Sequence, residues 1–202
     1  DEESEAPATA EEESMLLDRI DKLMPDCNVI IFEDYDKGTI TQRIIEAVVN
    51  KARAAHIPVV VDPKKRNFLN YQGVTLFKPN LKELREGLKV DIDPRDRSSV
   101  IRAVDAVKAR LGAKGIMLTL SEHGVFIDYE GKQISIPAHQ REIADVSGAG
   151  DTVISIAALC IALQLPAERI VALSNLGGGL VCQHVGVVPV NKEELFREAD
   201  EL

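Results

Sequence analysis

Apolar and polar positions repeat along the chain with two periods, which predict strands alternating with helices. Short continuous apolar runs indicate strands buried on both faces of a sheet, and apolar residues spaced three and four apart indicate amphipathic helices. Their alternation predicts an α/β fold, a mostly parallel sheet covered by helices on both faces. The predicted strands cover residues 29–32, 58–61, 74–77, 116–119, 125–129 and 133–137, the last two as a hairpin, and the main predicted helices cover residues 14–24, 41–55, 93–111, 152–165, 166–182 and 191–202.

The composition is that of a folded domain with an aliphatic core. The chain has 202 residues, 45% hydrophobic, with 4% aromatic residues and no Trp. Its three cysteines, Cys27, Cys160 and Cys182, lack the spacing of metal ligands, and two lie in apolar helical runs. Buried reduced thiols and a cytoplasmic location are therefore expected. Because no apolar stretch reaches membrane length and no signal peptide is recognisable, we expect no membrane partner.

Charge is concentrated at the start of the chain. The net charge is −9, and residues 1–13 contain seven acidic groups and no base, so the remainder is close to balanced. Without a basic surface, nucleic acid is not an expected partner. The acidic stretch predicts a flexible lead-in over residues 1–13, with Ser14 as the N-cap of the first helix and residues 14–202 as the folded part.

A polar, glycine-rich turn over residues 145–151 precedes the long apolar helix. Glycines allow a ligand close to the backbone, and the first amides of a helix have no intrahelical partner. With the positive end of the helix dipole, these amides favour bound negative charge. A carboxylate at Asp151 could then accept a proton, which suits phosphoryl transfer to a hydroxyl. The alternative is an ordinary helix cap, for which Asp, Ser and Gly are also common.

Polar clusters follow several predicted strands, at the edge where ligands collect in open α/β sheets. Residues 33–38 follow the first strand, and three cations at residues 64–66 follow the second; each cluster could equally be a solvated loop. Asn80 and Glu83 follow the third strand with the spacing of a capping box, so helix capping alone could explain them. His123, in the loop after residues 116–119, is expected to be exposed rather than catalytic. The glycines at 177–179 predict close packing against a neighbouring helix or a ligand.

Five motifs together resemble the PfkB carbohydrate kinases of the ribokinase-like superfamily. The segment D-V-S-G-A-G-D-T-V over residues 145–153 is similar to the family's second signature, and the others are D-Y-x-K-G, V-D-P-K, K-P-N-x-x-E and T-x-S-E-x-G. The resemblance covers about residues 14–198 and implies a three-layer αβα sandwich. It also implies that Asp151 is the catalytic base and that Gly148, Ala149 and Gly150 form the anion hole.

The resemblance assigns the remaining site residues, ATP as a substrate and Mg²⁺ as a cofactor. It implies a magnesium ion held largely through water by Asn80 and Glu83, and a monovalent cation such as K⁺ near Asp145. Ser121 stands where the family often has glycine. The implied nucleotide-binding residues are Lys78, Asn80, Glu83, Thr119, Ser121, Glu122, Gly124, Asn175 and Gly178, and the expected substrate-binding residues are Asp34, Lys37, Asp62 and Lys64.

Within the family, the motifs are most similar to bacterial heptose 7-phosphate kinases, which act in lipopolysaccharide precursor synthesis and often carry a fused nucleotidyltransferase. The glycine-rich first motif and the small β lid of the family are not found, so the chain is expected to be the carboxyl-terminal, nucleotide-binding part of a kinase. A sugar phosphate and ATP are the expected partners, and a homodimer is an open expectation. A kinase of another sugar or nucleoside, and a non-catalytic nucleotide-binding module, remain alternatives.

Overall fold

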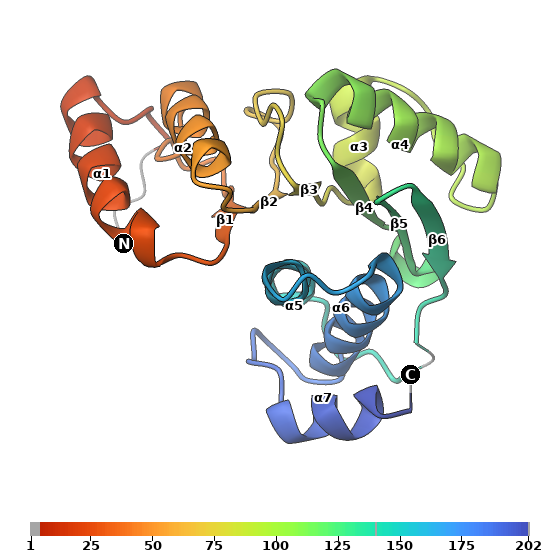
Figure 1. Cartoon of the computed structure of the whole chain (residues 1–202). Helices are drawn as coiled ribbons and strands as arrows, with labels where there is room; N and C mark the ends of the chain where they lie inside the picture. Colours follow the sequence, from red (N-terminus) through yellow and green to blue (C-terminus); the bar gives the residue numbers. More distant parts are fainter. Residues whose placement is uncertain (1–4, 140, 202) are drawn as a thin grey trace.

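A computed structural model describes residues 5–139 and 141–201 and shows a six-stranded sheet between two layers of helices (Figure 1). Neighbouring strands pair in chain order; β1 to β4 are parallel, and β5 is antiparallel to both neighbours. This is the predicted mostly parallel sheet. The strands are β1 (Ile30–Glu33), β2 (Val59–Asp62), β3 (Leu76–Phe77), β4 (Gly115–Thr119), β5 (Val125–Tyr129) and β6 (Lys132–Ile136).

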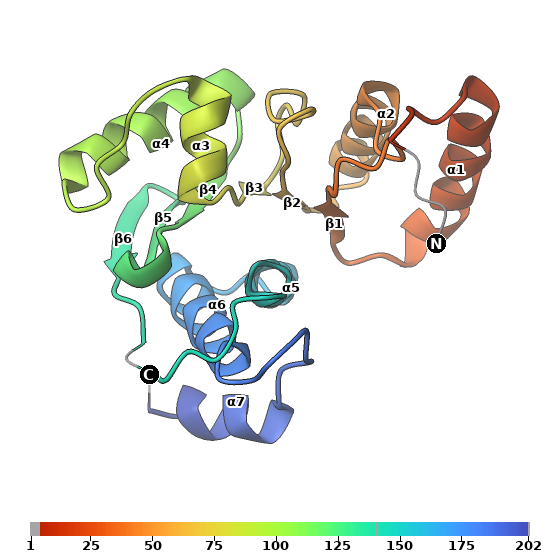
Figure 2. The same ribbon diagram turned by 180° about the vertical axis from the view of Figure 1, so that it is seen from behind.

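Helices cover both faces of the sheet, as the views from the front and from behind show (Figures 1 and 2). One layer contains α1 (Ala10–Leu23), α2 (Gln42–Ala54), α3 (Leu81–Leu88) and α4 (Arg97–Leu111), and the other contains α5 (Ala149–Ala162) and α6 (Ala167–Val181), with α7 (Lys192–Ala199) packed against α6. A separate apolar cluster fills the space on each side of the sheet. Because both faces are covered, every residue of β2 is buried.

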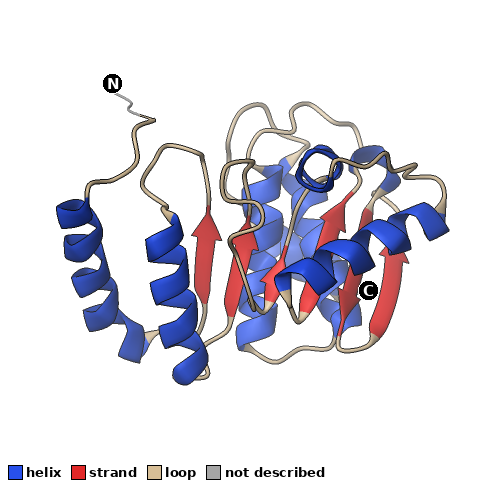
Figure 3. Cartoon of the chain, turned by 90° about the horizontal axis from the view of Figure 1, so that it is seen from above, coloured by secondary structure: helices blue, strands red, loops and turns tan. Residues whose placement is uncertain are grey.

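The carboxyl ends of the parallel strands lie at one edge of the sheet, visible as the arrowheads in Figure 3. The loops after β1, β2 and β3 therefore converge there, although they are far apart in sequence. The predicted hairpin between β5 and β6 is present, but its turn has two residues, Glu130 and Gly131, because Lys132 already belongs to β6 and pairs with Tyr129. Both turn residues have positive φ, as a tight two-residue hairpin turn favours.

Three helix starts differ from the predictions. The predicted Ser14 cap is wrong, since α1 begins at Ala10 with Thr9 as its N-cap. The acidic side chains at 11–13 belong to the first helical turn, where negative charge complements the helix dipole. Similarly, α4 begins at Arg97 after an Asp96 cap, and α5 begins at Ala149, three residues before the predicted start. Residues 1–4 of the predicted lead-in and the predicted helix end at 202 lie outside the described residues.

The cysteines only partly meet the expectation of buried thiols. Cys160 is buried, whereas Cys27 and Cys182 are half-buried; all three are free. Burial raises the pKa of Cys160 to about 11, so this thiol remains protonated and unreactive near neutral pH. No helix within the described ranges is both long and apolar enough to cross a bilayer.

We expect Thr9→Ala to lower the free energy of unfolding by about 1 kcal/mol, because Thr9 and Glu12 form a reciprocal capping box. Ser14→Ala is the matched control, because Ser14 lies inside α1 and its Oγ donates to the carbonyl of Ala10 at 2.8 Å. It should change stability by less than about 0.5 kcal/mol. Urea unfolding followed by circular dichroism measures both values; an equal or larger loss for Ser14→Ala would contradict the assignment of Thr9 as the cap.

Candidate active site

The glycine turn forms the amino-terminal mouth of α5. Gly148 is the N-cap and has the left-handed φ of 75°, which glycine adopts without steric cost. Among the described residues, the amides of Gly148 and Gly150 have no hydrogen-bond partner, whereas the Ala149 amide donates to the Val146 carbonyl at 3.3 Å. Two of the three predicted anion-hole amides are thus free to bind a negatively charged group.

Asp145 holds this turn in place. Its Oδ1 accepts hydrogen bonds from the backbone amide of Ser147 at 3.0 Å and from the Ser147 hydroxyl at 2.8 Å, and its Oδ2 accepts one from the Gly186 amide at 3.0 Å. The Ser147 bonds, more than the Gly186 bond, hold the pKa of Asp145 below its usual value. Both carboxylate oxygens of Asp145 therefore accept hydrogen bonds that hold the loop. Cation binding by Asp145 stays a prediction.

Asp151 is the third residue of α5 and lies close to the ends of β1 and β2. Its Oδ2 accepts a hydrogen bond from the Tyr35 hydroxyl at 3.2 Å. Glu33, the last residue of β1, is half-buried, and its pKa is raised by burial and then by the negative charges of Asp151 and Asp62. Residues 33–38 are expected from the sequence as a polar cluster at this edge of the sheet, with Asp34 and Lys37 as substrate contacts, and no role is predicted for Glu33 or Tyr35.

A row of alternating charges crosses the same edge. Lys78 is buried, 2% exposed, and its Nζ lies 3.3 Å from Oδ1 of Asp62. Lys64 Nζ lies 3.5 Å from that oxygen and 2.9 Å from Oε1 of Glu83. A Cβ on Gly150 would lie 3.6 Å from both Asp62 Oδ2 and Lys78 Nζ, so the row lies directly against the mouth of α5. The structure thus brings together predicted nucleotide and substrate residues.

Asn80 and Glu83 form the capping box that their spacing predicts. Asn80 Oδ1 accepts from the Glu83 amide and Glu83 Oε2 accepts from the Asn80 amide, both at 2.8 Å. Within the described part of the chain, no three acidic, His or Cys residues cluster as a metal site. One carboxylate and one amide fit an ion such as Mg²⁺ that keeps several waters and takes phosphate ligands, and they would not hold a metal alone.

A cavity of about 390 Å³ opens beside the glycine turn. Asn175, only 7% exposed, lines it and donates to the Pro137 carbonyl at 3.0 Å. Ser121 has φ 52°, a conformation that explains why glycine would suit this position. The predicted residues that line the cavity are Thr119, Ser121, Glu122, Gly124, Ala149, Gly150, Asn175 and Gly178. Asn80 pairs with Thr119 through an isolated bridge, which links α3 to this cavity.

Two of the α6 glycines are explained by close helix packing. A Cβ on Gly177 would lie 2.1 Å from Ile156 Cδ1, and one on Gly178 would lie 2.7 Å from Val153 Cγ2. Both contacts join α6 to α5. Gly178 also lines the cavity, so the missing side chain at this position allows both close packing against α5 and the approach of a ligand.

The predicted substrate residues Asp34 and Lys37 differ in exposure. Asp34 is 3% exposed, and its Oδ2 accepts from Tyr71 Oη at 2.8 Å and from Asn67 Nδ2 at 3.0 Å. Its Oδ1 accepts from the Asp36 amide at 2.9 Å, so this carboxylate anchors the loop after β1. Lys37 is exposed on the same loop.

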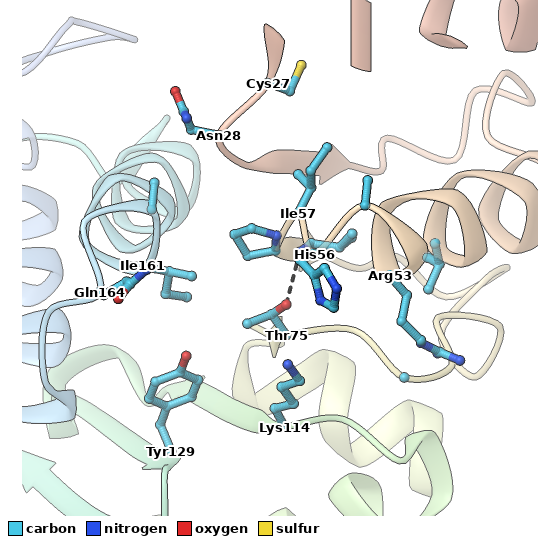
Figure 4. A pocket seen from close by; sticks show the side chains of 16 residues that line it. Cys27, Asn28, Arg53, His56, Ile57, Thr75, Lys114, Tyr129, Ile161 and Gln164 are labelled. Carbon is cyan, nitrogen blue, oxygen red and sulfur yellow. Dashed lines mark hydrogen bonds between the residues drawn. The ribbon is translucent and has the colours of Figure 1, made fainter. Parts of the chain in front are cut away.

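A larger cavity of about 630 Å³ lies at the opposite edge, among residues that precede the parallel strands (Figure 4). Figure 4 shows Lys114, Thr75 and Tyr129 at this cavity, with Thr75 Oγ1 accepting from the Val59 amide at 3.0 Å. None of the predicted site residues lines it. The smaller cavity is therefore the candidate nucleotide site.

Comparison with solved structures defines the class of fold. The chain superposes on phosphofructokinase-2 from Escherichia coli in complex with potassium with a TM-score of 0.83 and 15% identity, covering 96% of this chain and 63% of that one. For Arabidopsis thaliana ribokinase complexed with ribose and ATP, the TM-score is 0.74 and the identity 16%, with 96% and 60% covered. The fold is ribokinase-like, as predicted, and part of each structure has no counterpart in these 202 residues.

Residues 10–194 match the pfkB family carbohydrate kinases, and the chain belongs to this family. It is 36% identical over 196 residues to the bifunctional protein HldE of Syntrophotalea carbinolica, covering 96% of this chain and 40% of that protein. It is 38% identical over 208 residues to the bifunctional protein HldE of Granulibacter bethesdensis, covering 100% of this chain and 42% of that protein. The chain thus spans about two fifths of these curated relatives.

We expect Glu33→Gln to raise the melting temperature at neutral pH, because it removes a half-buried charge next to Asp151 and Asp62. The folded-state pKa of Glu33 is raised, so its ionisation costs stability above that pKa, and the cost disappears as the pH falls below it. The gain should therefore be present near pH 7 and shrink at about pH 4.

Thermal unfolding at both pH values measures this difference. Glu46→Gln, on the exposed face of α2, is the matched control and should show no such pH-dependent gain. A lower melting temperature of Glu33→Gln at neutral pH would contradict the electrostatic conflict inferred here.

Proposed function

We propose that the chain carries the nucleotide-binding and proton-accepting parts of a kinase that transfers the γ-phosphoryl group of ATP to a sugar phosphate hydroxyl. The single observation that carries this proposal is the position of Asp151 in the same helix start as the free amides of Gly148 and Gly150. Gly150 also lines a cavity whose lining includes six of the nine residues assigned to nucleotide: Thr119, Ser121, Glu122, Gly124, Asn175 and Gly178. Family membership supports a carbohydrate acceptor.

In the proposed reaction, Asp151 accepts the proton of the acceptor hydroxyl. The hydroxyl oxygen forms a bond to the γ-phosphorus while the bond from that phosphorus to the β,γ-bridging oxygen breaks, and the electron pair leaves with ADP. The amides of Gly148 and Gly150 stabilise charge on the transferring group. The Ala149 amide can join them once its hydrogen bond to the Val146 carbonyl breaks. Positioning and electrostatics supply most of the rate in such transfers.

The row of charges beside the turn supports a phosphate-binding role. In this proposal Lys78 binds nucleotide phosphates, and Lys64 and Lys37 bind the acceptor phosphate. Asp62, which contacts both Lys64 and Lys78, would orient these two side chains. Bound Mg²⁺ would neutralise phosphate charge. Asn80 and Glu83 would hold the ion through its waters, and Asp145 with nearby carbonyls would hold K⁺, the ion present in the E. coli phosphofructokinase-2 structure.

Heptose 7-phosphate is the proposed acceptor. Five motifs resemble heptose 7-phosphate kinases, and the curated relatives are bifunctional HldE proteins. Since the chain spans about two fifths of those relatives, assays should use the complete encoded protein that contains it. With purified protein, ATP and a panel of heptose 7-phosphate, fructose 6-phosphate, ribose and a nucleoside, we expect the highest kcat/KM for the heptose. A different preferred acceptor would reject this assignment, and ADP binding without any turnover would favour a binding module.

We expect Asp151→Asn to lower kcat by about 10³-fold or more while the affinity for ATP changes less than about threefold, because the amide cannot accept the proton. Single-turnover transfer measures the chemical step, and calorimetry measures nucleotide affinity. Asp18→Asn, an exposed change on α1, is the matched control and should leave both values unaltered. Unimpaired transfer by Asp151→Asn would remove Asp151 from the role of base.

A further inference from the structure

The carboxylate of Asp151 lacks the local partner that comparable residues have in this chain. Glu12 and Glu83 are also third residues of helices, and each accepts a hydrogen bond from the backbone amide of its N-cap at 2.8 Å. Both N-caps, Thr9 and Asn80, have extended backbone conformations. A reciprocal cap of this kind fixes the acidic side chain against its own helix.

The start of α5 does not provide this arrangement. Its N-cap, Gly148, is left-handed with φ 75° and ψ −2°, and no described hydrogen bond joins its amide to Asp151. The left-handed turn therefore keeps the amide available for an anion and leaves the carboxylate without a cap. Another group must fix the direction of the Asp151 side chain, because a freely rotating carboxylate would be a poorly placed base.

Tyr35 supplies the one hydrogen bond that the described residues make to this carboxylate, from its hydroxyl to Oδ2 at 3.2 Å. The two residues are 116 positions apart and are joined only through the fold. Burial and then the charge of Asp151 raise the pKa of Tyr35, so its hydroxyl stays protonated and remains a donor near neutral pH. Oδ1 has no partner among the described residues and is the oxygen left for an acceptor hydroxyl.

The loop that carries Tyr35 is itself anchored. Its neighbour Asp34 is buried and accepts hydrogen bonds from Tyr71, Asn67 and the Asp36 amide. The Asp34 amide also donates to the Asp62 carbonyl at 3.1 Å, which ties the loop to the end of β2. Tyr35 thus extends toward Asp151 from a fixed backbone, although its own side chain is 57% exposed.

We propose that Tyr35 is a positioning residue: its hydroxyl holds Oδ2 of Asp151 and thereby directs Oδ1 toward the acceptor. This inference rests on the proposed function, because it assigns Asp151 the role of base. It differs from the expectation for this loop, in which Asp34 and Lys37 contact the substrate. Here Asp34 fixes the backbone and Tyr35 acts on the base.

The test is Tyr35→Phe in the complete encoded protein, which removes only the hydroxyl. We expect kcat for acceptor phosphorylation to fall about 10- to 100-fold, with the KM values for ATP and acceptor within about twofold of wild type. Tyr129→Phe, in the cavity at the opposite edge, is the matched control and should retain wild-type kcat. Melting temperatures of both variants separate a local effect from lost stability.

A double variant tests whether Tyr35 acts on the rate through Asp151. In an Asp151→Asn background, Tyr35→Phe should lower the residual rate no further, because the two residues act through one hydrogen bond. An unchanged kcat of Tyr35→Phe, a rise in acceptor KM alone, or a full additional loss in the double variant would each overturn the inference. Full activity of Asp151→Asn would instead overturn the proposed function, so the two failures are distinguishable.

Discussion

The candidate site depends on one backbone conformation, the left-handed turn at Gly148. This conformation opens the first turn of α5, leaves two amides available for negative charge, and prevents the reciprocal cap seen at α1 and α3. The surrounding structure maintains it through Asp145, whose two carboxylate oxygens accept hydrogen bonds from Ser147 and Gly186. Any side chain at position 148 would strain this conformation and approach Val187 Cγ1 at 3.0 Å.

The parallel sheet places chemistry around this turn. Glu33, Asp62 and Lys78 lie at the carboxyl ends of β1, β2 and β3, at one edge of the sheet. The first turn of α5, in the helix layer opposite α1 to α4, brings Asp151 to the same edge. The pKa of Glu33 is raised by burial first and then by repulsion from the carboxylates of Asp151 and Asp62. The buried Lys78, 3.3 Å from Asp62, offsets part of it. Conflicting charges held together by a rigid scaffold are common at functional sites.

Features set by local sequence could be predicted. The capping box of Asn80 and Glu83 follows from a three-residue spacing, and the layered α/β fold follows from the two hydrophobic periods. The start of α5 was predicted three residues late because Gly148, Ala149 and Gly150 read as a loop, since glycine is a weak helix former. The start of α1 was misjudged because an acidic segment resembles a solvated tail, although acids suit a first turn. The contact between Tyr35 and Asp151 had no local signal, since it spans 116 positions.

The helix α5 contributes residues to both cavities, one at each of its ends. Its amino end forms the glycine turn, whereas Ile161 and Ala162 at its carboxyl end line the cavity at the opposite edge. Fourteen residues of α-helix make a stiff rod of about 21 Å between these two places. Tight packing of Gly177 and Gly178 against Ile156 and Val153 limits tilting of this rod. An axial shift of a fraction of an ångström would therefore move the walls of both cavities in concert.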